Sequence, residues 1–134
     1  MSTSRRHFTL EEANTLVPWL QDIFRDIQGM RERLVQAMGA MRELSIRARS
    51  NGEGTMDKEL AEREKELGRL NETLQRRLEQ INEKGILVRD IDRGLVDFLA
   101  LREGREIFLC WILGEDHISS WHELDTGFAG RKPL

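Results

Sequence analysis

The chain has few of the features that mark secreted, membrane-spanning or nucleic-acid-binding proteins. Its 134 residues include a single cysteine, Cys110, so no disulfide can form within the chain, as is typical of proteins in the reducing cytosol. The longest apolar run, residues 107–113, is too short to cross a bilayer. Residues 1–6 contain two arginines but are not followed by the apolar core of a secretory signal. We therefore expect a cytoplasmic protein without a membrane segment.

Basic and acidic residues are nearly balanced in number. There are 21 Lys and Arg residues against 24 Asp and Glu residues, and the formal net charge is −3. Such a surface has no general attraction for nucleic acid or for an anionic membrane, so neither is an expected partner. The composition, 39% hydrophobic and 34% charged, is that of a helical protein with solvated faces, and the length predicts a single domain over residues 1–134.

A long helix is predicted from Thr9 onward. The Thr9 hydroxyl can accept a hydrogen bond from the amide of Glu12 while Glu12 reaches back to Thr9, which is the capping box of a helix start. Pro18 cannot donate to the carbonyl of Asn14, so a kink is predicted near it. After the cap, apolar residues recur at alternate steps of four and three, as in a helix packed lengthwise against another. These residues are Leu16, Leu20, Ile23, Ile27, Met30, Leu34, Ala37, Met41 and Leu44.

A second helix follows a predicted turn at residues 50–54. Its apolar stripe runs from Met56 to Ile81, and Gly85 supplies the stop. The two helices form a predicted antiparallel hairpin over residues 9–85, in which Ile81 lies opposite about Ile23 because both helices rise equally per residue. The first helix then overhangs the second by about three turns. The apolar face of this overhang, residues 10–20, needs another partner.

After Gly85 the pattern changes to short segments rich in Val, Ile, Leu, Phe and Trp, separated by turn residues. The predicted fold class is α+β, mainly α, with a small antiparallel β-meander in residues 86–134 packed on the overhanging start of the first helix. The predicted strands are residues 86–89, 94–100, 106–113 and 118–124. Residues 107–113 are apolar on both faces and are predicted to form the central strand. The tail, residues 127–134, is predicted to be an ordered loop.

Several motifs are specific enough to compare with known families. They are Phe-Thr-Leu-Glu-Glu-Ala-Asn at residues 8–14 with Pro18, Gly-Leu-Val-Asp-Phe at 94–98, Leu-Cys-Trp at 109–111 with Gly114 and Glu115, Trp-His-Glu at 121–123, and residues 127–131. Together they resemble one uncharacterised prokaryotic family, the domain of unknown function numbered 2203. The resemblance spans nearly the whole chain and supports this architecture, but it implies no activity.

Ionisable residues in apolar surroundings indicate a candidate site in the C-terminal part. Asp97 lies between Val96 and Phe98 in a predicted strand, and His122 follows Trp121. Isolated burial of such groups is costly, so they need an ion pair, a backbone hydrogen bond or a metal. Imidazole together with carboxylates suits a divalent zinc, iron or manganese ion. The candidate metal ligands are Asp97, Glu115, His122, Glu123 and Asp125.

A structural network is the competing interpretation of the same residues. Neighbours such as His122 and Glu123 point to opposite faces of a strand, which favours a network of His122, Glu123 and Arg131 over a shared metal site. Further candidate functional residues are Glu12 and Asn14, which the overhang brings toward this segment, and Arg131 as an anion contact. Cys110 beside a histidine could act as a nucleophile, but its apolar neighbours favour a buried, inert thiol.

Two functions are consistent with these patterns. The leading hypothesis is a small interaction or regulatory module that acts as a homodimer through the long helices. Its basis is that Val17, Phe24 and Met38 widen the apolar stripe of the first helix beyond what one neighbouring helix covers. The alternative is a metal-binding protein or an enzyme with a carboxylate and histidine site in the C-terminal segment. The sequence does not decide whether the protein is an enzyme.

Overall fold

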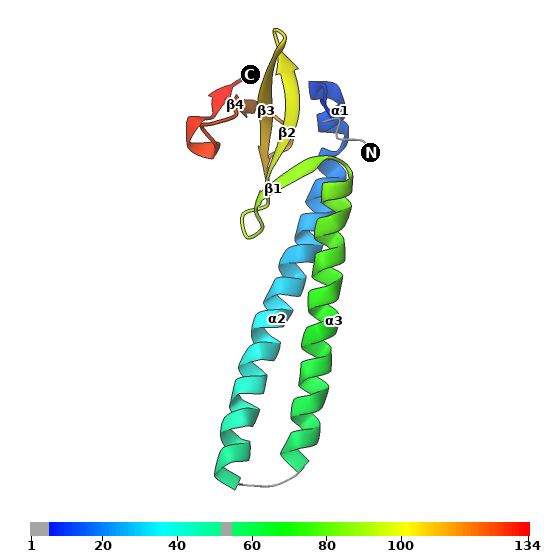
Figure 1. Ribbon diagram of the computed structural model, residues 1–134, viewed down its shortest axis with the longest axis vertical. Helices are drawn as coiled ribbons and strands as arrows, with labels where there is room; N and C mark the ends of the chain where they lie inside the picture. The colour runs from blue at the N-terminus through cyan, green and yellow to red at the C-terminus, as the bar shows by residue number, and fades with distance from the viewer. Residues whose placement is uncertain (1–5, 52–54) are drawn as a thin grey trace. The chain divides into compact units, whose positions relative to one another are not determined.

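The computed structural model of the protein describes residues 6–51 and 55–134. Within them the helices are α1 (Leu10–Thr15), α2 (Val17–Asn51) and α3 (Thr55–Glu83), followed by strands and one short 3-10 helix (Figure 1). These are β1 (Ile86–Asp90), β2 (Leu95–Arg102), β3 (Arg105–Ile112), β4 (Ser120–His122), η1 (Phe128–Gly130) and β5 (Lys132–Pro133). The predicted α+β, mainly α class is confirmed. The predicted turn at 50–54 falls largely outside the described residues, since α2 continues to Asn51.

The chain divides into two compact units, which are described separately. One unit comprises Met1–Arg25 and Leu78–Leu134, and the other comprises Asp26–Arg77. The helices α2 and α3 each contribute residues to both. That the whole chain folds as a single domain remains a prediction. None of the described helices combines the length and the apolar character needed to span a bilayer.

The unit Asp26–Arg77 is an antiparallel pair of helical segments. Nε of Arg77 donates to Oδ2 of Asp26 at 2.8 Å, which is within one residue of the predicted pairing of Ile81 with Ile23. Apolar residues at the predicted stripe positions are buried: Ile27, Met30, Ala37, Leu44 and Leu74. The spacing of apolar residues therefore predicted both the hairpin and its register.

Pro18 was predicted to kink one continuous helix. This is wrong, because one helix ends before Pro18 and a second helix begins there. Leu16 separates α1 from α2, and its amide donates to the carbonyl of Ala13 at 3.1 Å as the last bond of α1. Pro18 occupies the second position of α2. A proline in the first turn of a helix loses no hydrogen bond, because the amides there have no partner within the helix.

The strands form one antiparallel sheet in the order β1-β2-β3-β4-β5, so β3 is central as predicted. The connection between β2 and β3 is a two-residue turn in which Glu103 and Gly104 have φ of 54° and 78°. Positive φ at both positions is the geometry of tight hairpins, and glycine adopts it without strain. The tail differs from the predicted loop, because Lys132 and Pro133 pair with β4 and Leu134 donates to the carbonyl of Ser119 at 2.9 Å.

One face of the sheet packs against the N-terminal segment, α1 and the start of α2. We call it the packed face and define it by Phe98, Leu109 and Trp111, all buried. The ring of Phe8 meets Phe98 edge-on at 5.1 Å, and its amide donates to the carbonyl of Leu99 at 2.7 Å. The predicted overhang of the first helix is thus covered by the C-terminal segment.

Candidate metal site on the polar face of the sheet

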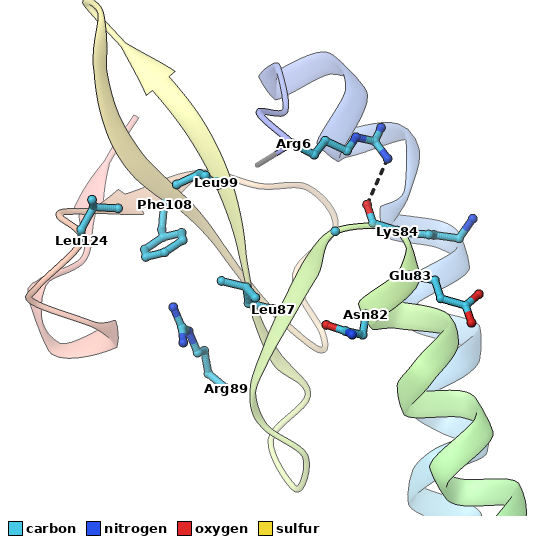
Figure 2. A pocket seen from close by; sticks show the side chains of 10 residues that line it. Arg6, Asn82, Glu83, Lys84, Leu87, Arg89, Leu99, Phe108 and Leu124 are labelled. Atoms are coloured by element: carbon cyan, nitrogen blue, oxygen red, sulfur yellow. Dashed lines mark hydrogen bonds between the residues drawn. The ribbon is translucent and has the colours of Figure 1, made fainter. Parts of the chain in front are cut away.

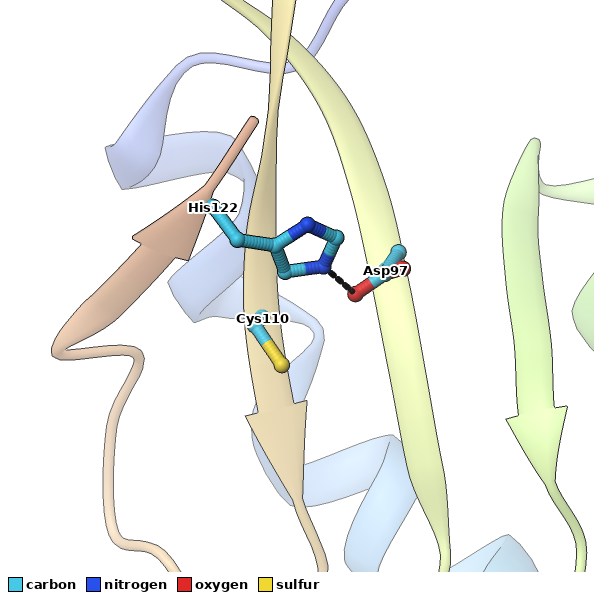
Figure 3. A group of neighbouring side chains, drawn as sticks. All are labelled: Asp97, Cys110 and His122. Atoms are coloured by element: carbon cyan, nitrogen blue, oxygen red, sulfur yellow. Dashed lines mark hydrogen bonds and ion pairs between the residues drawn. The ribbon is translucent and has the colours of Figure 1, made fainter. Parts of the chain in front are cut away.

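Strand pairing brings three donor side chains together on the other face. Asp97 of β2 lies opposite Cys110 of β3, and Phe108 of β3 lies opposite His122 of β4. Because side chains alternate along a strand, Asp97, Cys110 and His122 share one face while their neighbours Phe98 and Leu109 lie on the packed face. We call this side the polar face. Figure 3 shows the three side chains converging from three adjacent strands.

The three side chains on the polar face are close enough to share one ion. One donor atom from each lies within 4.8 Å of the other two. Nε2 of His122 is 2.9 Å from Oδ1 of Asp97, and both side chains are almost fully buried. Cys110 is also buried. A carboxylate, a thiol and an imidazole are thus held together out of water by backbone register.

Neighbouring groups fix the orientation of the imidazole. Nδ1 of His122 is 2.7 Å from the backbone oxygen of Glu123. A carbonyl oxygen only accepts, so Nδ1 carries a proton and donates it, which directs Nε2 toward Asp97 and Cys110. The rings of His122 and Phe108 pack with centroids 5.5 Å apart. Histidines that ligate metals commonly donate their second ring N–H to a backbone carbonyl in this way.

Asp97 is held from its other oxygen. Nε of Arg89 donates to Oδ2 at 2.9 Å, while Oδ1 faces His122. With its proton on Nδ1, the imidazole has only a lone pair at Nε2, and an ionised Asp97 has only lone pairs at Oδ1. The contact between these two atoms is therefore a hydrogen bond only when one further proton lies between them. The cluster therefore satisfies its own hydrogen bonds when no metal is bound.

The thiol of Cys110 is protonated at neutral pH. Burial raises its pKa to about 12, and the negative charge of the adjacent Asp97 acts in the same direction. Such a thiol is a poor nucleophile, which agrees with the interpretation of an inert buried cysteine. A metal ion can replace this proton, because coordination to a divalent ion deprotonates a thiol outright.

The donor set has the chemistry of a zinc site. Zinc binds cysteine sulfur, histidine nitrogen and carboxylate oxygen in tetrahedral sites. Nitrogen and oxygen ligands of one tetrahedral zinc ion lie about 3.3 Å apart, so His122 and Asp97 need to separate by only a few tenths of an ångström. Three protein ligands leave one coordination position for water or another ligand.

The structure brings together two of the five predicted metal ligands, Asp97 and His122, and adds Cys110 to them. Oε2 of Glu115 instead accepts from Nη2 of Arg131 at 2.8 Å, and its Oε1 accepts from the amide of Ile112 at 3.1 Å. Asp125 is exposed in a turn. The remaining predicted ligand, Glu123, pairs with Arg105 and Lys132.

The predicted network of His122, Glu123 and Arg131 is wrong as stated. The carboxylate of Glu123 and the guanidinium of Arg131 belong to separate ion pairs, and only the backbone oxygen of Glu123 meets His122. The carboxylate partner of His122 is Asp97. Glu123 lies just after the end of β4, and its carboxylate pairs with Arg105 and Lys132 instead, which residue spacing alone did not indicate.

Glu12 and Asn14 have structural partners on the helical side. Oε1 of Glu12 accepts from the Thr9 amide at 2.8 Å and the Thr9 hydroxyl accepts from the Glu12 amide at 3.0 Å, so the predicted capping box is confirmed. These bonds hold the pKa of Glu12 below its ordinary value. Oδ1 of Asn14 accepts from the amide of Ile118 at 2.7 Å, which ties α1 to the segment before β4.

Cys110 is the site residue that sequence reasoning left out of the donor set. Its signal was the two-residue turn Glu103-Gly104, because a tight turn at that position places Asp97 directly opposite Cys110. Treating the cysteine as an isolated thiol missed this pairing.

The fold and the cluster define a class of protein: an α+β chain with a helical hairpin, an antiparallel meander and a buried aspartate, cysteine and histidine on one face of the sheet. The chain belongs to the family described as uncharacterized conserved protein (DUF2203), whose model matches residues 6–134. The resemblance found in its motifs is thereby confirmed. Neither the curated proteins nor the solved structures contain a match to it.

Proposed function

We propose that the protein binds a divalent transition metal, zinc in first place, through Asp97, Cys110 and His122. The observation that carries the proposal is the convergence of three buried donor atoms, each within 4.8 Å of the others, on the polar face. The hydrogen bond from Nδ1 of His122 to the Glu123 carbonyl supports it, because it presents Nε2 as a ligand. Sulfur in the donor set favours zinc or iron over manganese, which prefers oxygen ligands.

Metal binding requires the cluster to lose protons. The Cys110 thiol gives up one, and the proton between His122 and Asp97 is the second, so about two protons leave for each ion bound at neutral pH. Affinity for zinc therefore rises with pH, about tenfold per pH unit for each proton released. A fourth ligand, water or a donor atom of a small molecule, completes the coordination.

The test is a zinc titration of the full chain after treatment with a chelator, in competition with a chromophoric chelator. We expect one zinc ion per chain, and a loss of about 100-fold or more in affinity in His122→Ala and Cys110→Ser. His7→Ala is the matched control, since Nε2 of His7 also pairs with a carboxylate, Glu106, at 2.8 Å but at an exposed position. Absence of zinc binding, or equal loss in the control, contradicts the proposal.

A second candidate function, self-association, is favoured by an exposed apolar stripe on α2. Val35, Met38 and Ile46 are 69%, 57% and 56% exposed and lie on one side of the helix by their spacing. Two residues that suggested the dimer, Val17 and Phe24, are instead buried within their own chain. The stripe that a second copy would cover is therefore limited to the three exposed residues.

Light scattering coupled to gel filtration tests the homodimer. A dimer mass at micromolar concentration that falls to the monomer mass in Met38→Glu supports it. Leu101→Glu is the control, because Leu101 is similarly exposed but lies in β2. A monomer mass for the unaltered chain rejects the homodimer and leaves the metal site unaffected.

A further inference from the structure

A cleft of about 690 Å³ lies beside the metal-site candidate, between the polar face and the turn that follows α3. Its floor is apolar and comes from Leu87, Leu99 and Phe108 on three adjacent strands, with Leu124 at its edge (Figure 2). Clefts of this volume hold small organic molecules, and an apolar floor with few polar groups is their usual lining. The cleft therefore has the size and surface to take a ligand with an apolar body.

Arg89 supplies the charge that a ligand would meet. Its Nε donates to Asp97, its guanidinium carbon lies 5.0 Å from the centroid of Phe108, and its side chain is 45% exposed. Among the described residues, no other nitrogen of Arg89 donates to the protein. The two terminal nitrogens thus remain for a ligand, and the guanidinium is already held in place by Asp97 and Phe108.

The remaining charged groups around the cleft leave it cationic. Arg6 lines it and donates from Nη1 to the carbonyl of Lys84 at 3.0 Å. Among the described residues that line the cleft, Glu83 is the one acidic residue, and Figure 2 shows its side chain and that of Lys84 directed away from the apolar floor. The ammonium of Lys84 lies 4.8 Å from the ring of Trp19. Arg89, which is paired with Asp97, is the cationic group that contacts the apolar floor, through the ring of Phe108.

We propose that this cleft binds a small organic acid, with its carboxylate on Arg89 and its hydrocarbon part on Leu87, Leu99 and Phe108. Two parallel bonds from one guanidinium to one carboxylate give both affinity and orientation, which a lysine does not supply. Transfer of the hydrocarbon part from water to the apolar floor, which three strands build, is favourable in free energy. No residue that lines this cleft is a proposed metal ligand, but Arg89 is held by Asp97, which is one, so the test uses the protein without metal.

The experiment uses octanoate as the probe and the full chain, free of metal, labelled with ¹⁵N. Octanoate is expected to shift the amide signals of Leu87, Arg89, Leu99 and Phe108, and octanol, the uncharged counterpart, to bind about ten to a hundredfold more weakly. Arg89→Gln is expected to reduce octanoate affinity by a similar factor. Arg105→Gln is the matched control, since Arg105 also pairs with a carboxylate but lies outside the cleft.

A second variant keeps the proposal testable if Arg89→Gln does not fold. Leu124 is 45% exposed, so Leu124→Glu is expected to fold normally while placing a negative charge beside the cleft and weakening octanoate binding. Shifts absent from the cleft at millimolar octanoate, or equal binding of octanoate and octanol, overturn the proposal. Zinc binding by the same protein is a separate readout, so failure here is distinguishable from failure of the metal site.

Discussion

The two faces of the sheet are made from alternate residues of the same strands, yet among the described residues the buried ionisable side chains lie on one of them. The packed face carries Phe98, Leu109 and Trp111 against the helical side, whereas the polar face buries Asp97, Cys110 and His122. Burial of the first set stabilises the fold, because it removes apolar surface from water. Burial of the second set stabilises it little or not at all, since desolvation offsets the attraction between paired charges. The comparison supports the proposal that the buried cluster on the polar face serves binding.

The largest expected effect is a difference in the free energy of unfolding between one substitution on the packed face and one on the polar face. Phe98→Ala on the packed face is expected to lower the free energy of unfolding by about 3–5 kcal/mol, since the side chain is fully buried. Phe108→Ala on the polar face is expected to lower it by only about 1–2 kcal/mol, because Phe108 borders the cleft and leaves no closed cavity. Urea denaturation measures both. Equal losses would remove the distinction between the faces.

The next largest effect is expected at the buried ion pair of Asp97 and His122. Asp97→Leu is expected to destabilise the protein by about 3 kcal/mol, because His122 then keeps a buried polar ring without its carboxylate. Replacing both residues in Asp97→Leu with His122→Leu is expected to recover most of that loss, since a well-packed apolar pair often matches a buried ion pair in stability. The same double variant is expected to bind no zinc. A double variant as unstable as Asp97→Leu alone would show that the pair is there for folding.

The buried thiol predicts how stability changes with pH. Burial raises the Cys110 pKa to about 12 from its ordinary value of 9.0, so between these values the folded chain keeps a proton that the unfolded chain loses. The free energy of unfolding then falls as pH rises, by about 1.4 kcal/mol per pH unit from this group, and below pH 9 the group has no such effect. Urea denaturation between pH 9 and 11 measures the slope. Cys110→Ala should flatten it, and an unchanged slope contradicts the assignment.

The smallest effect is expected on the helical side, at the capping box. Thr9→Ala is expected to lower the free energy of unfolding by about 1 kcal/mol at neutral pH. Because the pKa of Glu12 is lowered in the folded chain, its contribution to the cap is present above the ordinary carboxyl range and is lost as pH falls through the folded value. The cost of Thr9→Ala should therefore shrink in acid, as thermal unfolding at pH 7 and pH 3 can measure. A cost independent of pH would mean that Glu12 does not share in the cap.

The parts of the fold that depend on near neighbours in sequence were predictable. The capping box involves Thr9 and Glu12, three residues apart, and the apolar spacing of α2 extends over many turns, so each carries a strong local signal. The strand segments and the central position of β3 followed from apolar runs between turn residues. The break at Leu16 and the pairing of Lys132 with β4 were missed, since both depend on tertiary contacts that override local preference.

The candidate site was predicted only in part, for a related reason. Asp97 and His122 stood out because each is ionisable and has apolar neighbours. Glu115 and Glu123 were grouped with them by proximity in sequence, although the structure gives both of them arginine partners. Cys110 joins the cluster through strand register, which only the exact turn between β2 and β3 determines. Spacing along the chain could not supply that register without the turn geometry.

The most direct measurement of the central claim is a Co²⁺ titration of the chelator-treated protein, followed by absorption spectroscopy. If Asp97, Cys110 and His122 share one ion, a thiolate-to-cobalt charge-transfer band should appear and saturate at one ion per chain. The band should be absent in Cys110→Ser, weakened in His122→Ala and unchanged in His7→Ala. A protein that binds no Co²⁺, or whose bound Co²⁺ gives a spectrum insensitive to Cys110→Ser, contradicts the account.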